Sequence, residues 1–282
     1  MSSPNWSFTL GAAIRGLSLA RETDLLLIRG DNHTITLLNA RGALQGQLRR
    51  EGVIAADVSD DGSALAIASD DGRVWSLAPD LTVRWEAHLR TSATAIALDM
   101  FGQYLAISDK KNKLHLFDRA NKLLGQFDCP RPLQFLKFIP TLPRLAASAA
   151  FGWTGCLDLT NGQWAWSDRP VSNVGSLAVA AGGEPLLLAC FSDGIRRYDA
   201  ANGPHGAIKL PMPCGQVSLN FAGDRGVAAG AGKELFGFNA NGDLSFTREL
   251  DESPVALALS ALGERLVWAS ANGRVQSMSL SW

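Results

Sequence analysis

The chain has 282 residues, of which 46% are hydrophobic and 19% charged, and its 26 basic and 27 acidic residues give a formal net charge of −1. A chain of this size and apolar content can bury a substantial core. The nearly balanced charge excludes a global field that would attract nucleic acid or an anionic membrane. Aliphatic residues gather in runs of about four to six, which are too short for most helices and indicate strands.

Targeting signals are absent from the residue pattern. The first twenty residues lack the basic start and long apolar run of a signal peptide, and no run of about 18 apolar residues occurs, so we expect no membrane insertion. The four cysteines show no C-x-x-C spacing and are too few for a disulfide framework. We therefore expect reduced thiols and a cytoplasmic protein.

In chain order, the first predicted element is a strand over residues 6–10, WSFTL, which belongs to none of the repeats that follow. A turn-plus-strand unit then recurs seven times. Its copies are ARETDLLLIRG from Ala20, SDDGSALAIAS from Ser59, DMFGQYLAIS from Asp99, IPTLPRLAAS from Ile139, AAGGEPLLLAC from Ala180, FAGDRGVAAG from Phe221 and SALGERLVWAS from Ser260. A tight turn and an alternating strand follow each copy, as in DDGRVWSLA and ANGRVQSMS. Seven copies spaced about 40 residues apart fill the chain, which predicts one radial repeat architecture.

Each copy is predicted to form four strands. The first is apolar, as in residues 94–98, and the fourth is more polar, as in residues 83–86. This gradient is typical of blades whose inner strands are covered by neighbouring blades. The Asp-Gly, Asn-Gly and Gly-Gly turns between strands supply the positive φ that tight hairpins need. The predicted blades start near residues 14, 53, 93, 133, 174, 217 and 255.

The two ends of the chain predict how the ring closes. The last copy, from Val255 to Trp282, has room for only three strands, whereas the first copy already has four. We therefore expect residues 5–11 to supply the outer strand of the last blade and to cover its unpaired edge. The predicted fold is an all-β, seven-bladed β-propeller of four antiparallel strands per blade, in a single domain over residues 1–282.

The segment SDDGSALAIASDDGRVWSL from Ser59 resembles the repeat core of WD-repeat propellers, and this resemblance extends over nearly the whole chain. The Gly-His and Trp-Asp pairs of that family are missing, so its buried hydrogen-bond network does not carry over. The segments LDLTNGQWAWS from Leu157 and YDAANG from Tyr198 are instead similar to pyrroloquinoline-quinone-type blades. The enzymes of that type are typically exported and eight-bladed, with adjacent cysteines, and none of these features is present. The resemblance therefore implies a related blade structure and no cofactor.

Catalytic and metal-binding patterns are not found. The histidines His33, His88, His115 and His205 fall at different strand positions, which is a poor basis for a metal site. Asp60-Asp61-Gly62 and Asp70-Asp71-Gly72 recur at repeat spacing and lack the ligand pattern of a calcium loop, so we interpret them as turns. Neither a nucleophile motif nor a phosphate-binding loop occurs. We predict a protein that is not an enzyme.

A candidate binding surface follows from the predicted topology. Loops between blades and loops between strands two and three share one face of a propeller, which we call the top face; the other loops form the bottom face. In blades three and four the top face receives Lys110, Lys111, Arg131, Trp153 and Arg169. A tryptophan beside arginines is typical of an interface hot spot. The alternative is that Trp153 folds back and caps its blade.

Two other aromatic residues allow the same two interpretations. Trp164 and Trp166 lie two apart on one predicted strand and are expected to face one way, either packed on a neighbouring strand or forming a lateral patch.

The predicted function is a non-catalytic scaffold that binds a protein partner through the top-face loops of blades three and four. The alternative is a small-ligand or cofactor site, possibly enzymatic, in the central channel, where the inner strands place Asp57, Lys137, Ser176, Ser218 and Asn220. Nucleic-acid binding has only the local arginines in its favour, so none is expected.

Overall fold

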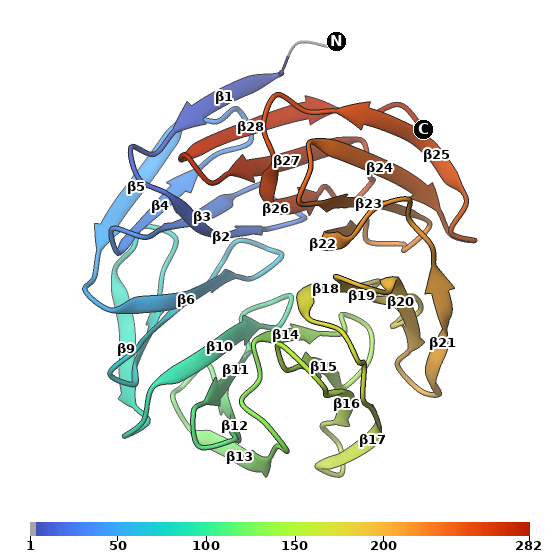
Figure 1. The fold of residues 1–282 in the computed structure, drawn as a ribbon. Helices are drawn as coiled ribbons and strands as arrows, with labels where there is room; N and C mark the ends of the chain where they lie inside the picture. The colour runs from blue at the N-terminus through green and yellow to red at the C-terminus, as the bar shows by residue number, and fades with distance from the viewer. Residues whose placement is uncertain (1–3) are drawn as a thin grey trace.

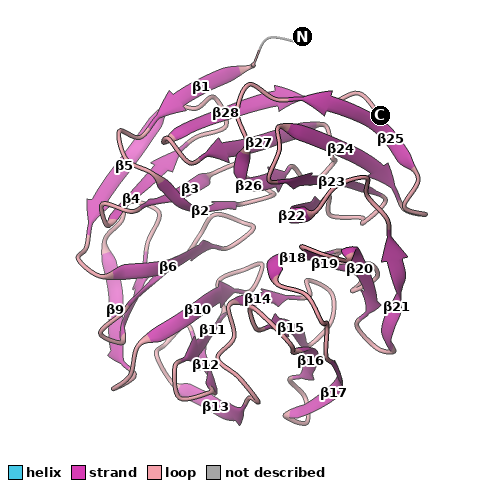
Figure 2. Ribbon diagram, viewed as in Figure 1, coloured by secondary structure: helices cyan, strands magenta, loops and turns pink. Residues whose placement is uncertain are grey.

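The computed structural model describes residues 4–282, which form 28 strands in seven antiparallel sheets of four. The sheets stand around a central axis as the blades of a propeller (Figure 1), and the described residues contain no helix (Figure 2). In the part of the chain described, then, no helix could span a membrane. The all-β, seven-bladed prediction is confirmed.

The strands of the first four blades follow the chain in order. They are β2 (Ile14–Leu19), β3 (Leu26–Gly30), β4 (Thr34–Leu38) and β5 (Leu44–Arg49); β6 (Val53–Val58), β7 (Leu65–Ser69), β8 (Arg73–Leu77) and β9 (Val83–His88); β10 (Ala93–Leu98), β11 (Tyr104–Asp109), β12 (Lys113–Asp118) and β13 (Leu123–Asp128); β14 (Phe135–Phe138), β15 (Arg144–Ser148), β16 (Thr154–Asp158) and β17 (Gln163–Asp168).

The last three blades continue the pattern, and the sixth begins at Cys214 rather than near residue 217. Their strands are β18 (Val174–Val179), β19 (Leu186–Cys190), β20 (Gly194–Asp199) and β21 (Gly203–Ile208); β22 (Cys214–Leu219), β23 (Arg225–Gly230), β24 (Glu234–Asn239) and β25 (Leu244–Glu249); β26 (Pro254–Leu259), β27 (Arg265–Ser270), β28 (Arg274–Ser279) and β1 (Trp6–Thr9).

Ring closure takes place in the seventh blade, where the first strand of the chain pairs with the last. β1 runs antiparallel to β28, with Trp6 opposite Ser277 and Thr9 opposite Arg274, and it forms the outer edge of the sheet (Figure 1). Backbone bonds extend this pairing at both ends, from Asn5 N to Ser277 O and from Leu10 N to Gly273 O. The predicted closure is confirmed, since β28 would otherwise leave its polar edge unpaired.

Tryptophans on outer strands tie neighbouring blades together. The indole Nε1 of Trp6 donates to the Ala40 carbonyl at 3.0 Å, that of Trp85 to Arg119 O at 3.1 Å, and that of Trp166 to Ala200 O at 3.0 Å. In each case the acceptor lies 34 residues further along the chain, in the hairpin that joins strands three and four of the next blade. The same indole therefore buries apolar surface and satisfies its own N–H donor.

Burial does not fall steadily from the axis outward as the residue pattern predicted. The second strands are the most deeply buried, and β7 and β19 are buried at every residue. The innermost strands β2 and β6 contain several half-buried residues, because one edge of each faces the central channel. The outer strands alternate between exposed and half-buried residues, which agrees with their predicted polarity.

Candidate functional site

The structure brings four of the five predicted binding residues to the top face as exposed side chains. Lys110 and Lys111 lie on the hairpin between β11 and β12, Arg131 follows β13, and Arg169 follows β17. Backbone bonds hold these loops to one another, from Lys110 N to Ser92 O at 3.0 Å and from Cys129 N to Asn112 O at 2.9 Å. The guanidinium of Arg131 lies against the turn at Gly152, in the next blade.

The fifth residue, Trp153, is not exposed: only 4% of its surface is accessible, and it packs in the core between the third and fourth blades. Its ring meets that of Trp164 edge to face, with centroids 4.7 Å apart. A Cβ at Gly155 would lie 2.9 Å from the Trp153 ring, so the glycine provides the space into which the indole folds. Of the two interpretations, the folded-back cap is correct, and the exposed hot spot at Trp153 is not.

Trp164 and Trp166 do not face one way either. A β-bulge between Cys156 and Leu157 shifts the register of β17, so that the two indoles turn toward different neighbours. Trp164 donates to the Asp128 carbonyl of the third blade, whereas Trp166 stacks on Tyr198 of the fifth blade at 5.2 Å between ring centroids. Both rings are packing residues, and they form no lateral patch.

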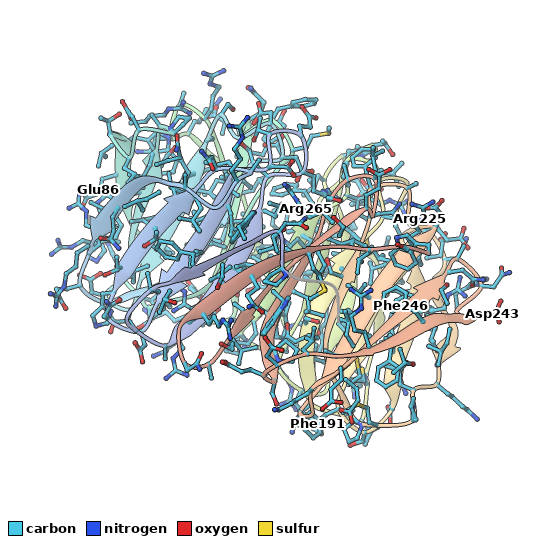
Figure 3. The ribbon with its side chains drawn as sticks, turned by 90° about the horizontal axis from the view of Figure 1, so that it is seen from above. Glu86, Phe191, Arg225, Asp243, Phe246 and Arg265 are labelled. Atoms are coloured by element: carbon cyan, nitrogen blue, oxygen red, sulfur yellow. The ribbon has the colours of Figure 1, made fainter. Side chains whose placement is uncertain are left out.

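Three other apolar side chains are exposed on the top face instead. The exposed fractions are 45% for Phe151, 80% for Val171 and 46% for Phe191. They come from three successive loops that meet at Asn173: Phe151 forms an isolated bridge with Asn173, and the Phe191 N–H donates to the Asn173 carbonyl at 2.9 Å. We call Phe151, Val171 and Phe191 the apolar triad. In Figure 3, Phe191 lies at the lower edge of the view, which is the face that we call the top face, and Arg225 lies on the opposite side of the molecule.

The sequence held a partial signal for the triad. Phe151 occupies a turn position where other repeats have Asp71, Lys111 or Asn272, so it departs from the pattern of its own repeat. Val171 stands in a loop between blades, with no repeat pattern to compare. The order of the residues alone does not show that these three loops meet at Asn173.

Around the triad, the acidic side chains have partners within the protein, whereas several basic side chains have none among the described residues. The acids on the same loops already hold partners: Asp109 contacts His115 at 2.9 Å, Asp128 pairs with Lys113, and Arg196 bonds both Asp168 at 3.1 Å and Asp193 at 3.3 Å. Within residues 4–282, by contrast, Lys110, Lys111, Arg131 and Arg169 form no ion pair. This sector of the top face therefore presents free positive charge.

The central channel is the second candidate site, and it encloses a cavity of about 220 Å³. One residue of each innermost strand occupies the same register position and forms a layer around the axis. The layer consists of Ser18, Asp57, Ala97, Lys137, Ala178, Ser218 and Ala258.

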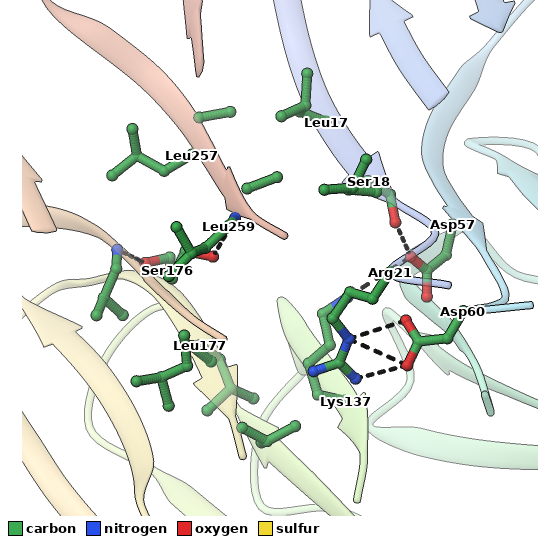
Figure 4. Close-up of a pocket in the computed structure, with 18 of the residues that line it drawn as sticks. Leu17, Ser18, Arg21, Asp57, Asp60, Lys137, Ser176, Leu177, Leu257 and Leu259 are labelled. Atoms are coloured by element: carbon green, nitrogen blue, oxygen red, sulfur yellow. Dashed lines mark hydrogen bonds and ion pairs between the residues drawn. The ribbon is translucent and has the colours of Figure 1, made fainter. Parts of the chain in front are cut away.

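Most polar groups of this layer are satisfied by the neighbouring blades (Figure 4). The carboxylate of Asp57 accepts hydrogen bonds from the Ser18 hydroxyl at 2.5 Å and from the Leu98 N–H at 3.0 Å. The ammonium of Lys137, on the fourth blade, lies 3.6 Å from the same carboxylate. Ser218 accepts from the Leu259 N–H at 3.0 Å. These side chains satisfy channel-side backbone groups that have no neighbouring strand.

An ion pair that the residue pattern did not reveal lies at the bottom mouth of the channel. Arg21 donates three hydrogen bonds of 2.6–3.1 Å to the carboxylate of Asp60 (Figure 4), and its guanidinium lies 5.2 Å from the ring centroid of Phe221. Asp60 was interpreted as a turn residue, but this side chain joins the first blade to the second. A cavity of about 510 Å³ adjoins the pair on the bottom face.

The cysteine thiols are not activated as nucleophiles in the described structure. The four cysteines are buried free thiols, and burial raises the pKa of Cys129, Cys156 and Cys214 to about 12 and that of Cys190 to about 11. They therefore stay protonated and poorly nucleophilic at neutral pH. Across residues 4–282, His, Cys, Asp and Glu form no group of three or more that could hold a metal ion. The side chain of Asn220, which we expected in the channel, is used within its own turn. Its amide nitrogen donates to Asp224, and its amide oxygen accepts from the N–H groups of Gly223 and Arg225.

Sequence comparisons add no relative from which a function could be transferred. No protein-family model matches the chain, and no curated protein matches it in sequence. The class of protein is therefore defined by the fold, which is a seven-bladed β-propeller.

Proposed function

We propose that this propeller is a non-catalytic scaffold that binds a protein partner through its top face, on the loops of blades three to five. The observation that carries the proposal is the apolar triad, in which Phe151, Val171 and Phe191 are exposed together around Asn173. Exposed apolar groups that cluster and are bordered by charge are typical of protein-binding surfaces. The predicted surface on blades three and four is thus extended to the fifth blade.

The loops that carry the triad and the neighbouring arginines are held in place by the protein itself. Val174 N donates to Ala150 O at 2.9 Å, Leu133 N donates to the Ser108 hydroxyl at 3.0 Å, and prolines stand next to Arg131 and Arg169. Loops with few remaining conformations lose less entropy on docking. A rigid ring with fixed loops supports a binding role.

The assignment to a propeller type is part of the proposal. The repeat of about 40 residues and the Asp-capped turns support a place near WD-repeat or pyrroloquinoline-quinone-type propellers. Asp61 and Asp71 each accept a backbone N–H two residues ahead, at 2.9 and 3.1 Å. We further propose a cytoplasmic location, because a reducing compartment suits four unpaired thiols.

Affinity capture from the source organism, followed by mass spectrometry, tests the scaffold proposal. The wild-type protein is compared with a Phe151→Ser/Val171→Ser variant and with a Phe101→Ser/Leu262→Ser control, whose residues are also exposed but lie on the bottom face. We expect a partner that is retained by the wild type and the control and lost from the first variant. Equal recovery of every protein from all three would reject the triad as the binding surface.

The channel supports a second candidate function, the binding of a small ligand. Its support is the cavity of about 220 Å³ together with the half-exposed ammonium of Lys137. A thermal-shift screen of metals, quinone cofactors and nucleotides tests this candidate, because a ligand raises the melting temperature by mass action. A reproducible shift that disappears in Lys137→Met would favour the channel, and a flat screen would reject these ligand classes.

A further inference from the structure

We propose that the segment bound at the top face is acidic as well as apolar, with carboxylates that flank its apolar side chains. This inference rests on the proposed function and adds the chemistry of the partner. It follows from the charged residues around the triad, which are a separate observation from the exposed apolar side chains.

The order of the loops around the ring shows where the cations stand relative to the triad. The free cations begin on the third blade with Lys110 and Lys111 and continue through Arg131. Phe151 follows on the fourth blade, and Arg169 and Val171 share the next loop. Phe191 lies on the fifth blade. Lys209, exposed in the loop after β21, follows beside the Phe191 hairpin, so cations border the apolar triad on both sides.

The cations are available for a partner because the protein does not use them. Each acid on these loops is held by another residue: His115 holds Asp109, Lys113 holds Asp128, and Arg196 holds Asp168 and Asp193. The phenol of Tyr198 also donates to Asp168 at 2.9 Å. A partner carboxylate would thus meet Arg131 and Arg169 without displacing an internal acid. Such complementarity favours acidic partners and excludes basic ones.

Selection from a library of random twelve-residue peptides displayed on phage tests this chemistry without a known partner. Against the wild-type protein we expect enrichment of peptides in which Asp or Glu residues stand beside Leu, Phe or Trp. The enrichment should vanish against Arg131→Glu/Arg169→Glu and persist against Arg41→Glu/Arg119→Glu, whose residues are exposed on the bottom face. Melting temperatures check that both variants fold.

Fluorescence anisotropy with the best selected peptide gives the magnitude. Replacing its acids by Asn and Gln should weaken binding about tenfold or more, because several exposed ion pairs are lost together. Equal binding by the neutral peptide, enrichment of neutral or basic peptides, or no enrichment at all would overturn the inference. The scaffold proposal would still stand or fall on its capture experiment.

An oligonucleotide of twelve thymidines and vesicles containing phosphatidylserine serve as competing probes. The inference expects neither to displace the selected peptide. Displacement that is lost in Arg131→Glu/Arg169→Glu would show that the cations serve nucleic acid or an anionic membrane, and would overturn it.

Discussion

Two regions of this propeller, the bottom mouth of the channel and the top-face surface on blades three to five, use arginines in opposite ways. At the bottom mouth of the channel, Arg21 is clamped by Asp60 and covered by Phe221. On the top face, Arg131 and Arg169 lie beside the exposed Phe151 and Val171 and have no carboxylate partner among the described residues. An arginine beside an aromatic ring is therefore not evidence of a binding site in itself. What distinguishes the two regions is whether the charge is already satisfied inside the fold.

The largest expected effect comes from removing the closure on which both regions depend. Deletion of residues 1–11 should lower the free energy of unfolding by about 5 kcal/mol, since it removes roughly five backbone hydrogen bonds worth about 1 kcal/mol each. Urea unfolding followed by tryptophan fluorescence measures the change. An unchanged midpoint and slope would mean that β1 contributes nothing to the ring.

Breaking the bottom ion pair should affect stability and leave binding intact. Asp60→Ala leaves the largely buried Arg21 without its acceptor, which should cost about 2 kcal/mol of unfolding free energy. Capture of the partner by the folded variant should match the wild type. Arg169→Ala is the matched control on the top face and should change stability by less than about 0.5 kcal/mol. Similar free energies of unfolding for both variants would show that Asp60 does not stabilise the fold more than Arg169 does.

Truncating one member of the apolar triad should weaken partner binding and leave stability unchanged. Val171→Ser should weaken partner binding by about 1 kcal/mol or more, a fivefold or greater rise in Kd, because its exposed side chain would be buried only in the complex. Titration calorimetry with the captured partner measures the Kd, and unfolding should shift by less than about 0.5 kcal/mol. A loss of stability without a loss of affinity would contradict the proposed role.

Raising the salt concentration should weaken partner binding at the top face and leave the stability of the fold almost unchanged. Raising the salt concentration from about 0.05 to 0.5 M shortens the screening length severalfold, so binding at the exposed cations should weaken several-fold. The melting temperature should change little, because the Arg21–Asp60 pair is mostly shielded from solvent. Salt-independent affinity would show that Lys110, Lys111, Arg131 and Arg169 do not contribute to binding.

The residue pattern predicted the fold because every blade repeats the same strand spacing and the same types of turn residue. The spacing of about 40 residues, the turn chemistry and the surplus strand at residues 6–10 together gave seven blades and their closure. The placement of individual side chains depended on details inside each blade that the repeat spacing does not encode, such as a single small residue or the bulge that recurs in the outer strands. Trp153 folds inward because Gly155 leaves room for it, and Trp164 and Trp166 separate because of one bulge.

Two signals could have improved the prediction of the site. Gly155 stands in a strand where other repeats have larger side chains such as Trp75, His115 and Gln276, which indicates space for a neighbouring ring. Arg21 and Asp60 occupy equivalent positions in adjacent repeats, 39 residues apart, so their contact could have been expected. The meeting of Phe151, Val171 and Phe191 depends on loop geometry that no repeat spacing encodes.

The pairing of β1 with β28 also orders events during synthesis. The side chains of Asn5 and Ser279 bond across 274 positions of sequence, so β1 cannot pair until β28 has been synthesised. Six blades are each built from strands that are consecutive in the chain, whereas the seventh combines β1 with β26, β27 and β28 and needs contacts across the whole ring. Closing the ring is thus the contact with the largest loop-closure entropy in the fold, and β1 stays unpaired until it forms.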